Sequence, residues 1–508
     1  MTWGNGKSIK LVLRCLQIKV KLKGLIIVRI LRNKIKNLFD SDFYEFINHS
    51  KNYVSADLFT KGLAFISIPI FTRLLVPSEY GVLAIFSSFV AIFVIISGLG
   101  IRGAVTRYYY EKTDDFDQFY GSNILFVLVW SILLSFLLFI FRDDLIKFFK
   151  IPLTVIYFGI GVILFSTTFE IYQAYLQASK QSKKIAKLNI FKAVSGLILA
   201  IIITVLLKEK RYYGKIIAQI IVVSVFFVYS LVSILKISKI NFTFSYVNYS
   251  LLFGIPVVFH LLSQYVLSSF DLVIINQLVG TKETGLYSFA YKVGMLQNII
   301  SMGMLRAWSP MFYEKLNNKQ YNDINNLAKK YAKIVYIVAL TLILFSQELV
   351  IILADKKYYA SLNIVPIVVI SYVFFFLYAM YVNYTFYYKK TYLIAVFTII
   401  AGSINIGLNY LLIPKYGYQA AAWTTLISYA CLFVLHYLNV RFIIKPEKIT
   451  KLSVLLPNFF GIIGIVFLFY LVQGYVTNYF VLIGIKLLIL SASVLFLFGR
   501  KIKEMARK

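Results

Sequence analysis

The stretch "FTRLLVPSEYGVLAIFSS" at residues 71–88 ends one apolar run, makes a polar turn and begins a second apolar run. About 203 residues later, "IINQLVGTKETGLYSFAY" at residues 274–291 has the same form. The matched residues are Leu75-Val76 with Leu278-Val279, Pro77-Ser78 with Gly280-Thr281, and Glu79-Tyr80-Gly81 with Glu283-Thr284-Gly285. The chain therefore contains one helical hairpin in two copies, and its composition decides what kind of hairpin this is.

The composition is that of a membrane protein. The chain has 508 residues, of which 60% are hydrophobic and only 15% are charged, and its mean hydropathy is +0.78. A soluble protein carries about 25% charged residues. Apolar runs of about 20 residues recur from residue 53 to the end, and such a run is long enough to cross ~30 Å of hydrocarbon as a helix. Strands of a membrane barrel would be about 10 residues long and would alternate apolar and polar residues, which this chain does not do.

We predict an all-α integral membrane protein with about fourteen transmembrane helices. The expected spans are 53–75, 82–101, 120–141, 152–178, 185–207, 214–236, 251–279, 285–306, 330–353, 362–388, 391–413, 417–440, 452–473 and 478–499. The loops between them are short, and none could form a soluble catalytic domain. We therefore expect a protein that is not an enzyme and has no catalytic residues.

Basic residues predict the orientation of the spans. If the N-terminus is cytoplasmic, the segments on that side hold 37 of the 53 Lys and Arg residues, whereas the outer loops hold 11. The positive-inside rule then places both termini in the cytoplasm. The net charge of +32 follows largely from this bias, so we expect no nucleic-acid partner.

The basic segment at residues 7–39 leaves two interpretations open. It has neither a clean apolar region nor a small-residue cleavage site, which argues against a signal peptide. It is either a segment that lies on anionic lipid or the product of a start codon assigned too early. Cys15 and Cys431 are isolated, so we expect neither a disulfide framework nor a metal site.

The hairpin belongs to a longer repeat. At the same offset of 203 residues, the further matches are Gly100 with Gly303, Tyr110-Glu111 with Tyr313-Glu314, Tyr213-Gly214 with Tyr416-Gly417, and Ala218 with Ala421. These matches relate spans 1–6 to spans 7–12. Because six is an even number, both copies enter the membrane from the same side and form parallel repeats with a cleft between them. The expected units are a basic segment at 1–52, an N-lobe at 53–240, a C-lobe at 241–441, and two added spans with a basic tail at 442–508.

The repeated segments resemble a known family. "TRLLVPSEYGVLAIFSSFVAIFVIISGLGIRGAVTRYYYE" (72–111) is similar to the opening of polysaccharide-type flippases of the multidrug/oligosaccharidyl-lipid/polysaccharide exporter superfamily. "DLVIINQLVGTKETGLYSFAYKV" (271–293) is similar to the start of their second half. The resemblance covers roughly residues 45–450. It implies movement of undecaprenyl-diphosphate-linked oligosaccharide units to the outer leaflet of the bacterial cytoplasmic (inner) membrane, for surface polysaccharides of the O-antigen or capsule type.

The expected partners are this lipid-linked oligosaccharide and membrane lipids, with a polysaccharide polymerase and glycosyltransferases as candidate protein partners. We expect no cofactor, and the energy source left open is a proton or sodium gradient. Two alternatives share the fold: a multidrug-type cation-coupled antiporter and a flippase for the lipid-linked peptidoglycan precursor. An antiporter needs few cationic residues in its binding site. The lysines within the spans, described in the next paragraph, therefore favour the flippase.

Charged side chains inside membrane spans are costly and usually face a bundle interior or a cavity, which makes them the first candidates for a site. Asp57 and Lys61 in the first span share a helix face, and their repeat partners in the seventh span are His260 and Gln264. We predict that Lys61 and Lys292 bind the diphosphate as point charges, while Asp57 balances Lys61 in the empty site. The alternative for Asp57 and Lys61 is a structural pair within one helix.

The fourth span carries a polar stripe at Glu170, Gln173 and Gln177. The stripe could bind sugar hydroxyls, exchange a proton or cation, or make only interhelical hydrogen bonds. Asp271 and Glu170 are the main candidates for ion coupling, and His260 is a further candidate for this role or for a counter-charge.

Other cations have a plain alternative role. Arg73 and Lys192 are predicted to contact the substrate, although both could also extend to the interface, and Lys486 is expected to do so or to shape a lipid-facing groove. The arginines that close the second and eighth spans could receive an incoming diphosphate or simply anchor the helices; they are Arg102, Arg107 and Arg306.

Tyrosines are abundant, and three of them lie in the inner part of the tenth span, at Tyr378, Tyr381 and Tyr388. Tyrosine rings could stack on sugars in a glycan cleft. We favour the alternative of an interfacial belt of tyrosines.

Overall fold

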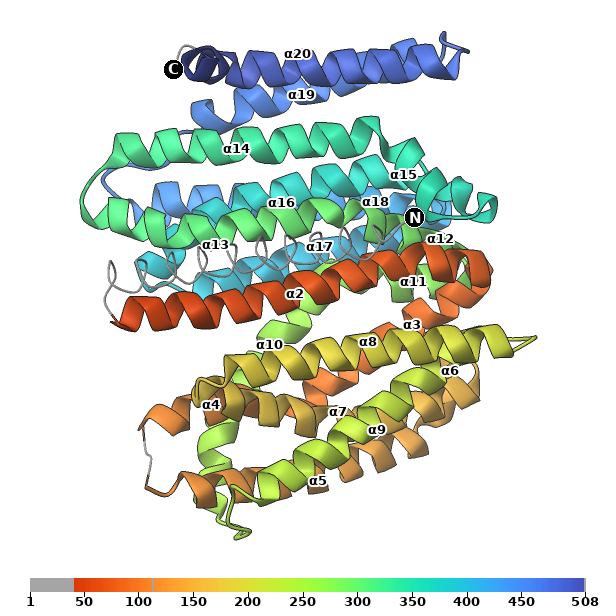
Figure 1. Cartoon of the computed structure of the whole chain (residues 1–508), viewed down its shortest axis with the longest axis vertical. Helices are drawn as coiled ribbons and strands as arrows, with labels where there is room; N and C mark the ends of the chain where they lie inside the picture. Colours follow the sequence, from red (N-terminus) through yellow and green to blue (C-terminus); the bar gives the residue numbers. More distant parts are fainter. Residues whose placement is uncertain (1–40, 112–113, 507–508) are drawn as a thin grey trace, which may run out of the picture.

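The computed structural model describes residues 41–111 and 114–506, and within these ranges the chain is helical and contains no strand (Figure 1). The helices of the first half, called the N-lobe below, are α2 (Ser41–Leu74), α3 (Pro77–Gly98), α4 (Ile101–Glu111), α5 (Phe116–Ile140), α6 (Arg142–Phe149), α7 (Leu153–Ala178), α8 (Ser182–Leu206) and α9 (Tyr212–Leu235). The first predicted segment, residues 1–52, lies mostly outside the described residues.

The second half, called the C-lobe below, comprises α10 (Phe244–Ser269), α11 (Asp271–Leu278), α12 (Thr281–Gly294), α13 (Leu296–Asn317), α14 (Tyr321–Leu344), α15 (Ser346–Leu353), the 3-10 helix η1 (Lys356–Ser361), α16 (Ile364–Tyr387), α17 (Tyr392–Tyr416), α18 (Ala420–Leu438) and the π-helix η2 (Asn439–Ile444). Two further helices, α19 (Leu452–Gln473) and α20 (Tyr479–Ala506), pack on α14 at the edge of the molecule (Figure 1).

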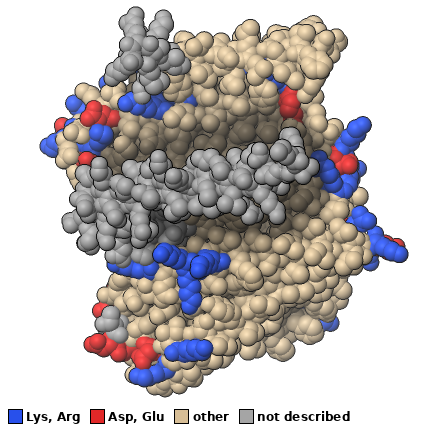
Figure 2. Space-filling view, in the orientation of Figure 1, with Lys and Arg blue, Asp and Glu red and all other residues tan. Residues whose placement is uncertain are grey.

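The long helices lie side by side and run across the view of Figure 1 in alternating directions, as membrane helices do. Lys, Arg, Asp and Glu gather mainly at the two ends of the helices in Figure 2, and the broad surface between these ends is largely free of charge on this face. Backbone polar groups in hydrocarbon must be satisfied within the protein, and continuous helices achieve this. The distribution of charge therefore agrees with a bundle whose helices cross the bilayer.

The predicted number of fourteen spans is not confirmed. Among the described residues, eleven helices are long and apolar enough to cross a membrane, and the pair α14 and α15, bent by 63°, would be a twelfth. The first and eighth predicted spans are helical but are not in this set. The first, in α2, carries Asp57, Lys61 and Arg73, and the eighth is divided at Met295 between α12 and α13. The two exceptions are the helices that contain the predicted diphosphate-binding lysines.

The two copies of the hairpin contact each other in the folded protein. The second helices of the hairpins, α3 and α12, cross at Gly81 and Gly285. A Cβ atom on Gly81 would lie 1.8 Å from the carbonyl oxygen of Thr281, and one on Gly285 would lie 1.8 Å from that of Pro77. Small residues let membrane helices approach this closely. The repeated glycine is therefore one close contact between the N-lobe and the C-lobe, and Gly100 with Gly254 on α10 makes another.

The turn residues of the hairpin also have a local role. Pro77 occupies the first position of α3, where its missing N–H is not needed, and the backbone N–H of Val76 donates to the Glu79 carboxylate at 3.2 Å. In the second copy, Gly280 precedes α12 with φ +142°, a conformation that favours glycine. Both turns lie at the predicted outer end of the helices, so the contact between α3 and α12 is made close to that end.

Candidate functional site

A cavity of about 880 Å³ opens between α2, α8 and α9 of the N-lobe. Its charged lining residues are Asp57, Lys192, Lys215 and Arg306, and the last of these reaches in from α13 of the C-lobe. The rest of the lining is small, polar or apolar, which leaves the positive charges as the strongest feature of the wall. Three cations and one carboxylate give this N-lobe cavity a net positive lining.

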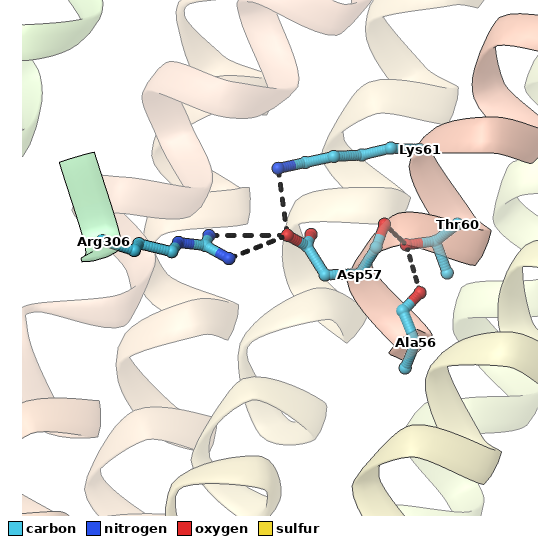
Figure 3. Close-up of polar contacts among 5 residues, drawn as sticks. All are labelled: Ala56, Asp57, Thr60, Lys61 and Arg306. Atoms are coloured by element: carbon cyan, nitrogen blue, oxygen red, sulfur yellow. Dashed lines mark hydrogen bonds and ion pairs between the residues drawn. The ribbon is translucent and has the colours of Figure 1, made fainter. Parts of the chain in front are cut away.

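The Asp57 carboxylate binds Arg306 and one further cation, Lys61, which does not itself line the cavity. Its Oδ2 atom accepts hydrogen bonds from Lys61 Nζ at 3.0 Å and from both terminal nitrogens of Arg306 at 3.4 and 3.5 Å (Figure 3). Lys61 lies one turn further along α2, whereas Arg306 lies on α13, so this carboxylate joins the two lobes. The side chains are 39–54% exposed. At this exposure an ion pair contributes little to stability, and its partners can be exchanged at low cost.

Lys192 and Lys215 approach the same cavity from two neighbouring helices. The Nζ atom of Lys192 on α8 lies 4.6 Å from the ring centroid of Phe169, and that of Lys215 on α9 lies 4.9 Å from the ring of Phe71. Aromatic faces attract cations and hold the amines without neutralising them. Lys215 was not predicted as a site residue. It follows a run of basic residues that indicates an outer loop, and Lys215 was counted as part of that loop.

A second cavity, of about 850 Å³, lies within the C-lobe between α10, α12, α13 and α16. It is lined by the predicted site residues His260, Gln264 and Lys292. Five tyrosines also line it, at Tyr291, Tyr313, Tyr372, Tyr378 and Tyr429. The expected belt therefore does not describe Tyr378, which faces a cavity instead.

Lys292 connects the C-lobe cavity to the N-lobe. Its Nζ atom donates a hydrogen bond to the hydroxyl of Tyr80 on α3 at 3.1 Å and lies 4.4 Å from the centroid of that ring. Lys215 is near enough to interact electrostatically with both Lys292 and Tyr80. Two lysines from different lobes thus flank one tyrosine at the boundary between the lobes, and no acidic side chain among the described residues forms a salt bridge with either of them.

The predicted stripe on α7 divides between different surroundings. Glu170 lines a third cavity, of about 810 Å³, together with Arg102 and Arg107 of α4. Gln173 donates to Asn189 Oδ1 on α8 at 2.6 Å, which is an interhelical hydrogen bond. Gln177 is exposed and is not among the residues that line the three cavities. The structure therefore does not gather the stripe into one binding surface.

Asp271 is almost completely buried, with 1% of its surface exposed. Its Oδ2 atom accepts hydrogen bonds from the Tyr287 hydroxyl at 2.7 Å and from Thr425 Oγ1 at 2.8 Å, while Oδ1 has no partner among the described residues. Next to Thr425, Thr424 donates to Asn409 at 2.6 Å. A buried carboxylate with one unpaired oxygen is costly, so Asp271 stays a candidate to hold a proton or a cation.

Two predicted cations have structural surroundings. Arg73 donates to the carbonyl oxygens of Pro69 and Ile352 at 2.9 and 3.1 Å, which joins the ends of α2 and α15. The expectation for Lys486 is wrong, because its side chain does not extend to the interface. It is 1% exposed and binds both oxygens of Glu348 at 2.7 and 2.9 Å. The sequence gives no sign of this pair, since its members lie 138 residues apart.

A family profile described as "Polysaccharide biosynthesis protein" matches residues 52–315, and a second profile, MatE, matches residues 256–411. Among related sequences, the chain is 22% identical over 410 residues to the Lsg locus putative protein 1 of Haemophilus influenzae, covering 79% of this chain and 94% of that protein. An uncharacterised membrane protein of the same organism is 23% identical over 375 residues, covering 71% and 89% of the two chains.

Solved structures share the fold. The lipid II flippase MurJ in an inward closed conformation superposes with a TM-score of 0.71 at 17% identity, covering 89% of this chain and 99% of that one. A multidrug resistance MATE family transporter in an inward-facing conformation gives 0.57 at 15% identity, covering 75% and 94%. These are membrane transporters, which agrees with the expectation of a protein that is not an enzyme. The likeness to these structures shows a shared fold, and the profile that covers residues 52–315 shows that the chain belongs to the polysaccharide biosynthesis protein family.

Proposed function

We propose that the protein moves undecaprenyl-diphosphate-linked oligosaccharides from the inner to the outer leaflet of the bacterial cytoplasmic membrane, with both of its termini in the cytoplasm. The observation that carries the proposal is that Lys215 and Lys292 line cavities of different lobes, and that Lys292 crosses the boundary between the lobes to bind Tyr80 of the N-lobe. A diphosphate in hydrocarbon would lose its hydration at a cost of many kcal/mol. Ammonium groups from both lobes can stabilise the diphosphate in place of water, whether the cleft between the lobes opens to the inner or to the outer leaflet.

The surroundings of the lysines suit the rest of the cargo. Tyrosine rings in the C-lobe cavity present flat apolar faces and hydroxyls, which suit sugar rings and their hydroxyl groups. Gln264 and His260 add hydrogen-bonding groups to the same wall. The C-lobe cavity is the better place for the glycan, and the boundary between the lobes is the better place for the diphosphate.

Asp57 suggests how substrate binding could be linked to movement of the lobes. Its carboxylate binds Lys61 and Arg306 and so connects α2 to α13. An incoming diphosphate carries more negative charge and more acceptor oxygens than one carboxylate, so it competes for the same two cations. Loss of the link to Asp57 would release α2 from α13 at the inner side, while the glycine contact between α3 and α12 holds the outer ends. This order of events is what alternating access requires.

Ion coupling is assigned to Asp271 in this proposal, with a proton or a sodium ion as the coupled species. The unpaired Oδ1 atom and the neighbouring threonine and asparagine oxygens support this choice. Glu170 is the second candidate, because it lines a cavity between α3, α4, α7 and α10.

The test is surface display of the glycan in the native bacterium. Replacing Lys61→Ala or Lys292→Ala should abolish display, while the protein inserts into the membrane at normal levels. Lys282→Ala is the matched control, since Lys282 lies on the same helix as Lys292 but is exposed at its outer end. Display at the wild-type level in both variants would refute the site assignment.

Two other cargoes can be separated experimentally. The MatE match at residues 256–411 makes a multidrug-type antiporter the second candidate, and efflux of a fluorescent organic cation from cells would support it. A peptidoglycan precursor is the rival within lipid-linked substrates. Rescue of a strain that lacks its own precursor flippase would favour that cargo, whereas loss of surface polysaccharide alone on deletion of this gene favours ours.

A further inference from the structure

A pocket of about 700 Å³ lies on the far side of the C-lobe from the lobe boundary, between α14, α19 and α20. Its polar wall comes from α14, where Lys329, Lys330 and Lys333 occupy little more than one helical turn. Its apolar wall comes from Ile334 on α14 and from Phe496, Leu497 and Phe498 on α20. Neither the cavities of the candidate site nor their lining residues overlap with this pocket.

Two of the three lysines, Lys329 and Lys330, form no salt bridge with an acidic side chain among the described residues. No Asp or Glu is among the described residues that line the pocket. Lys333 has a structural role in addition, because its Nζ atom donates to the carbonyl oxygen of Leu497 at 2.5 Å and lies 5.7 Å from the Phe498 ring. This bond fixes the position of α20 and leaves a compact group of ammonium charges next to it.

The pocket lies where the apolar part of two helices ends. The membrane-spanning part of α20 extends from Tyr479 to Phe498, and residues 499–508 that follow are the basic sequence "GRKIKEMARK". On α14 the three lysines precede the apolar stretch that begins at Ile334. A pocket with ammonium groups at its outer part and aromatic rings at its inner part therefore sits at the boundary between headgroups and hydrocarbon, on the predicted cytoplasmic side.

We propose that this pocket binds the headgroup phosphate of an anionic membrane phospholipid. Lys329 and Lys330 would contact the phosphate oxygens, and the first part of an acyl chain would lie against Phe496 and Phe498. Basic pockets between membrane helices on the cytoplasmic side have the chemistry for this, since they combine an electrostatic and an apolar contact. The bound lipid would join α14, α19 and α20 and so hold the two added helices to the C-lobe. The proposal does not depend on the transported cargo.

The test measures lipid binding to the purified full-length protein in a neutral detergent, by following the thermal unfolding midpoint as lipid is added. Dioleoyl phosphatidylglycerol should raise the midpoint in a saturable way, and dioleoyl phosphatidylcholine should raise it much less. In the variant Lys329→Gln/Lys330→Gln the Kd for phosphatidylglycerol should rise about 30-fold, as expected for two lysines near a lipid surface. The variant Lys329→Arg/Lys330→Arg should keep the wild-type Kd within a few-fold.

The matched control is Lys183→Gln/Lys187→Gln, which removes two exposed lysines from α8 at the same predicted side of the membrane. This control should bind phosphatidylglycerol like the wild type. Equal Kd values for the Lys329→Gln/Lys330→Gln variant and the control would overturn the proposal. So would an equal stabilisation by inorganic phosphate, because the pocket would then take a free anion without a lipid chain. Glycan display is not the readout, so the outcome is separate from that of the proposed function.

Discussion

Lysine side chains inside the helices of this protein have two kinds of surroundings. Lys192, Lys215 and Lys292 lie beside aromatic rings and line cavities, and no described acid pairs with them. Lys486 also lies 5.7 Å from two aromatic rings, but it is enclosed and neutralised by Glu348. A cation held by an aromatic face keeps its charge for a ligand, whereas one in a buried ion pair does not. The surroundings of each lysine, more than its depth in a span, separate binding candidates from structural residues.

The lysine that the sequence did not suggest gives the first prediction. Lys215→Gln keeps the side chain polar and removes its charge from the N-lobe cavity. A hydrogen bond to a charged group contributes about 1.5–3 kcal/mol, so we expect glycan export to fall by about tenfold or more. Lys215→Arg should retain most of it. The measurement is the amount of surface glycan per cell at equal protein levels.

Lys208→Gln serves as the control, because Lys208 is exposed in the connection just before α9. If both glutamine variants export glycan equally well, Lys215 does not contact the substrate.

Asp271 gives the second prediction. Asp271→Asn has nearly the same shape and can still accept hydrogen bonds from Tyr287 and Thr425, but it cannot bind a proton or attract a cation. We expect export to become independent of the proton or sodium gradient and to slow strongly, with the thermal unfolding midpoint unchanged or raised. Transport in vesicles with each gradient imposed in turn measures this. An Asn variant that still responds to the gradient would move the coupling role to another carboxylate, with Glu170 next in line.

At the scale of helices, the contact between α3 and α12 depends on two glycines. Any Cβ atom at Gly81 or Gly285 would meet a backbone carbonyl of the other helix at 1.8 Å. Backbone atoms cannot move aside as a flexible side chain can, so the helices must separate. This makes the repeated glycine of the hairpin a packing requirement at the boundary between the lobes.

The third prediction follows from that contact. Gly285→Ala should lower the stability of the protein by about 1–3 kcal/mol, the usual cost of overpacking, and Gly81→Ala should do the same. Gly303→Ala on α13 is the control, since nothing lies within 4 Å of its Cβ position. Thermal unfolding in detergent compares the three. Equal midpoints for Gly285→Ala and Gly303→Ala would show that the helices do not approach so closely.

The docking of α20 gives the fourth prediction. Lys486→Met leaves Glu348 as a nearly buried, unpaired carboxylate, which should destabilise the protein by about 3–5 kcal/mol. The double variant Lys486→Met/Glu348→Leu removes both charges, and it should recover most of the loss. Denaturation of the wild type and both variants in the same detergent tests this. A double variant as unstable as the single one would mean that the pair itself, rather than the unpaired charge, matters.

The helices were largely predictable from sequence because hydropathy reports burial in lipid directly. The first and eighth predicted spans are not among the helices that are long and apolar enough to cross a membrane. Asp57, Lys61 and Lys292 interrupt their apolar pattern. Those interruptions were informative, since all three residues lie at cavities or at the ion pair between the lobes. Partners on distant helices were not predictable. Neither Glu348 beside Lys486 nor Arg306 beside Asp57 has any local signal, because the packing of lobes brings them together.

At the scale of the whole molecule, the two lobes are joined by a close helix contact near the outer ends of the helices and by an ion pair nearer the inner ends, where Gly100 and Gly254 also approach closely. The glycine contact of α3 and α12 provides the first, and Asp57 with Arg306 provides the second. The duplication in the sequence predicted that such lobes exist. The side of the membrane on which the lobes close the cleft could not be predicted from one sequence, because it depends on the relative tilt of the lobes.

The central claim is that lysines from both lobes carry a lipid-linked diphosphate through the membrane. Reconstitution in liposomes tests it most directly, with a fluorescent undecaprenyl-diphosphate oligosaccharide whose outward movement is read by an enzyme or quencher added outside. We predict translocation by the wild type and by Lys282→Gln, and none above protein-free vesicles by Lys215→Gln/Lys292→Gln. Translocation by this double variant at the wild-type rate would contradict the account.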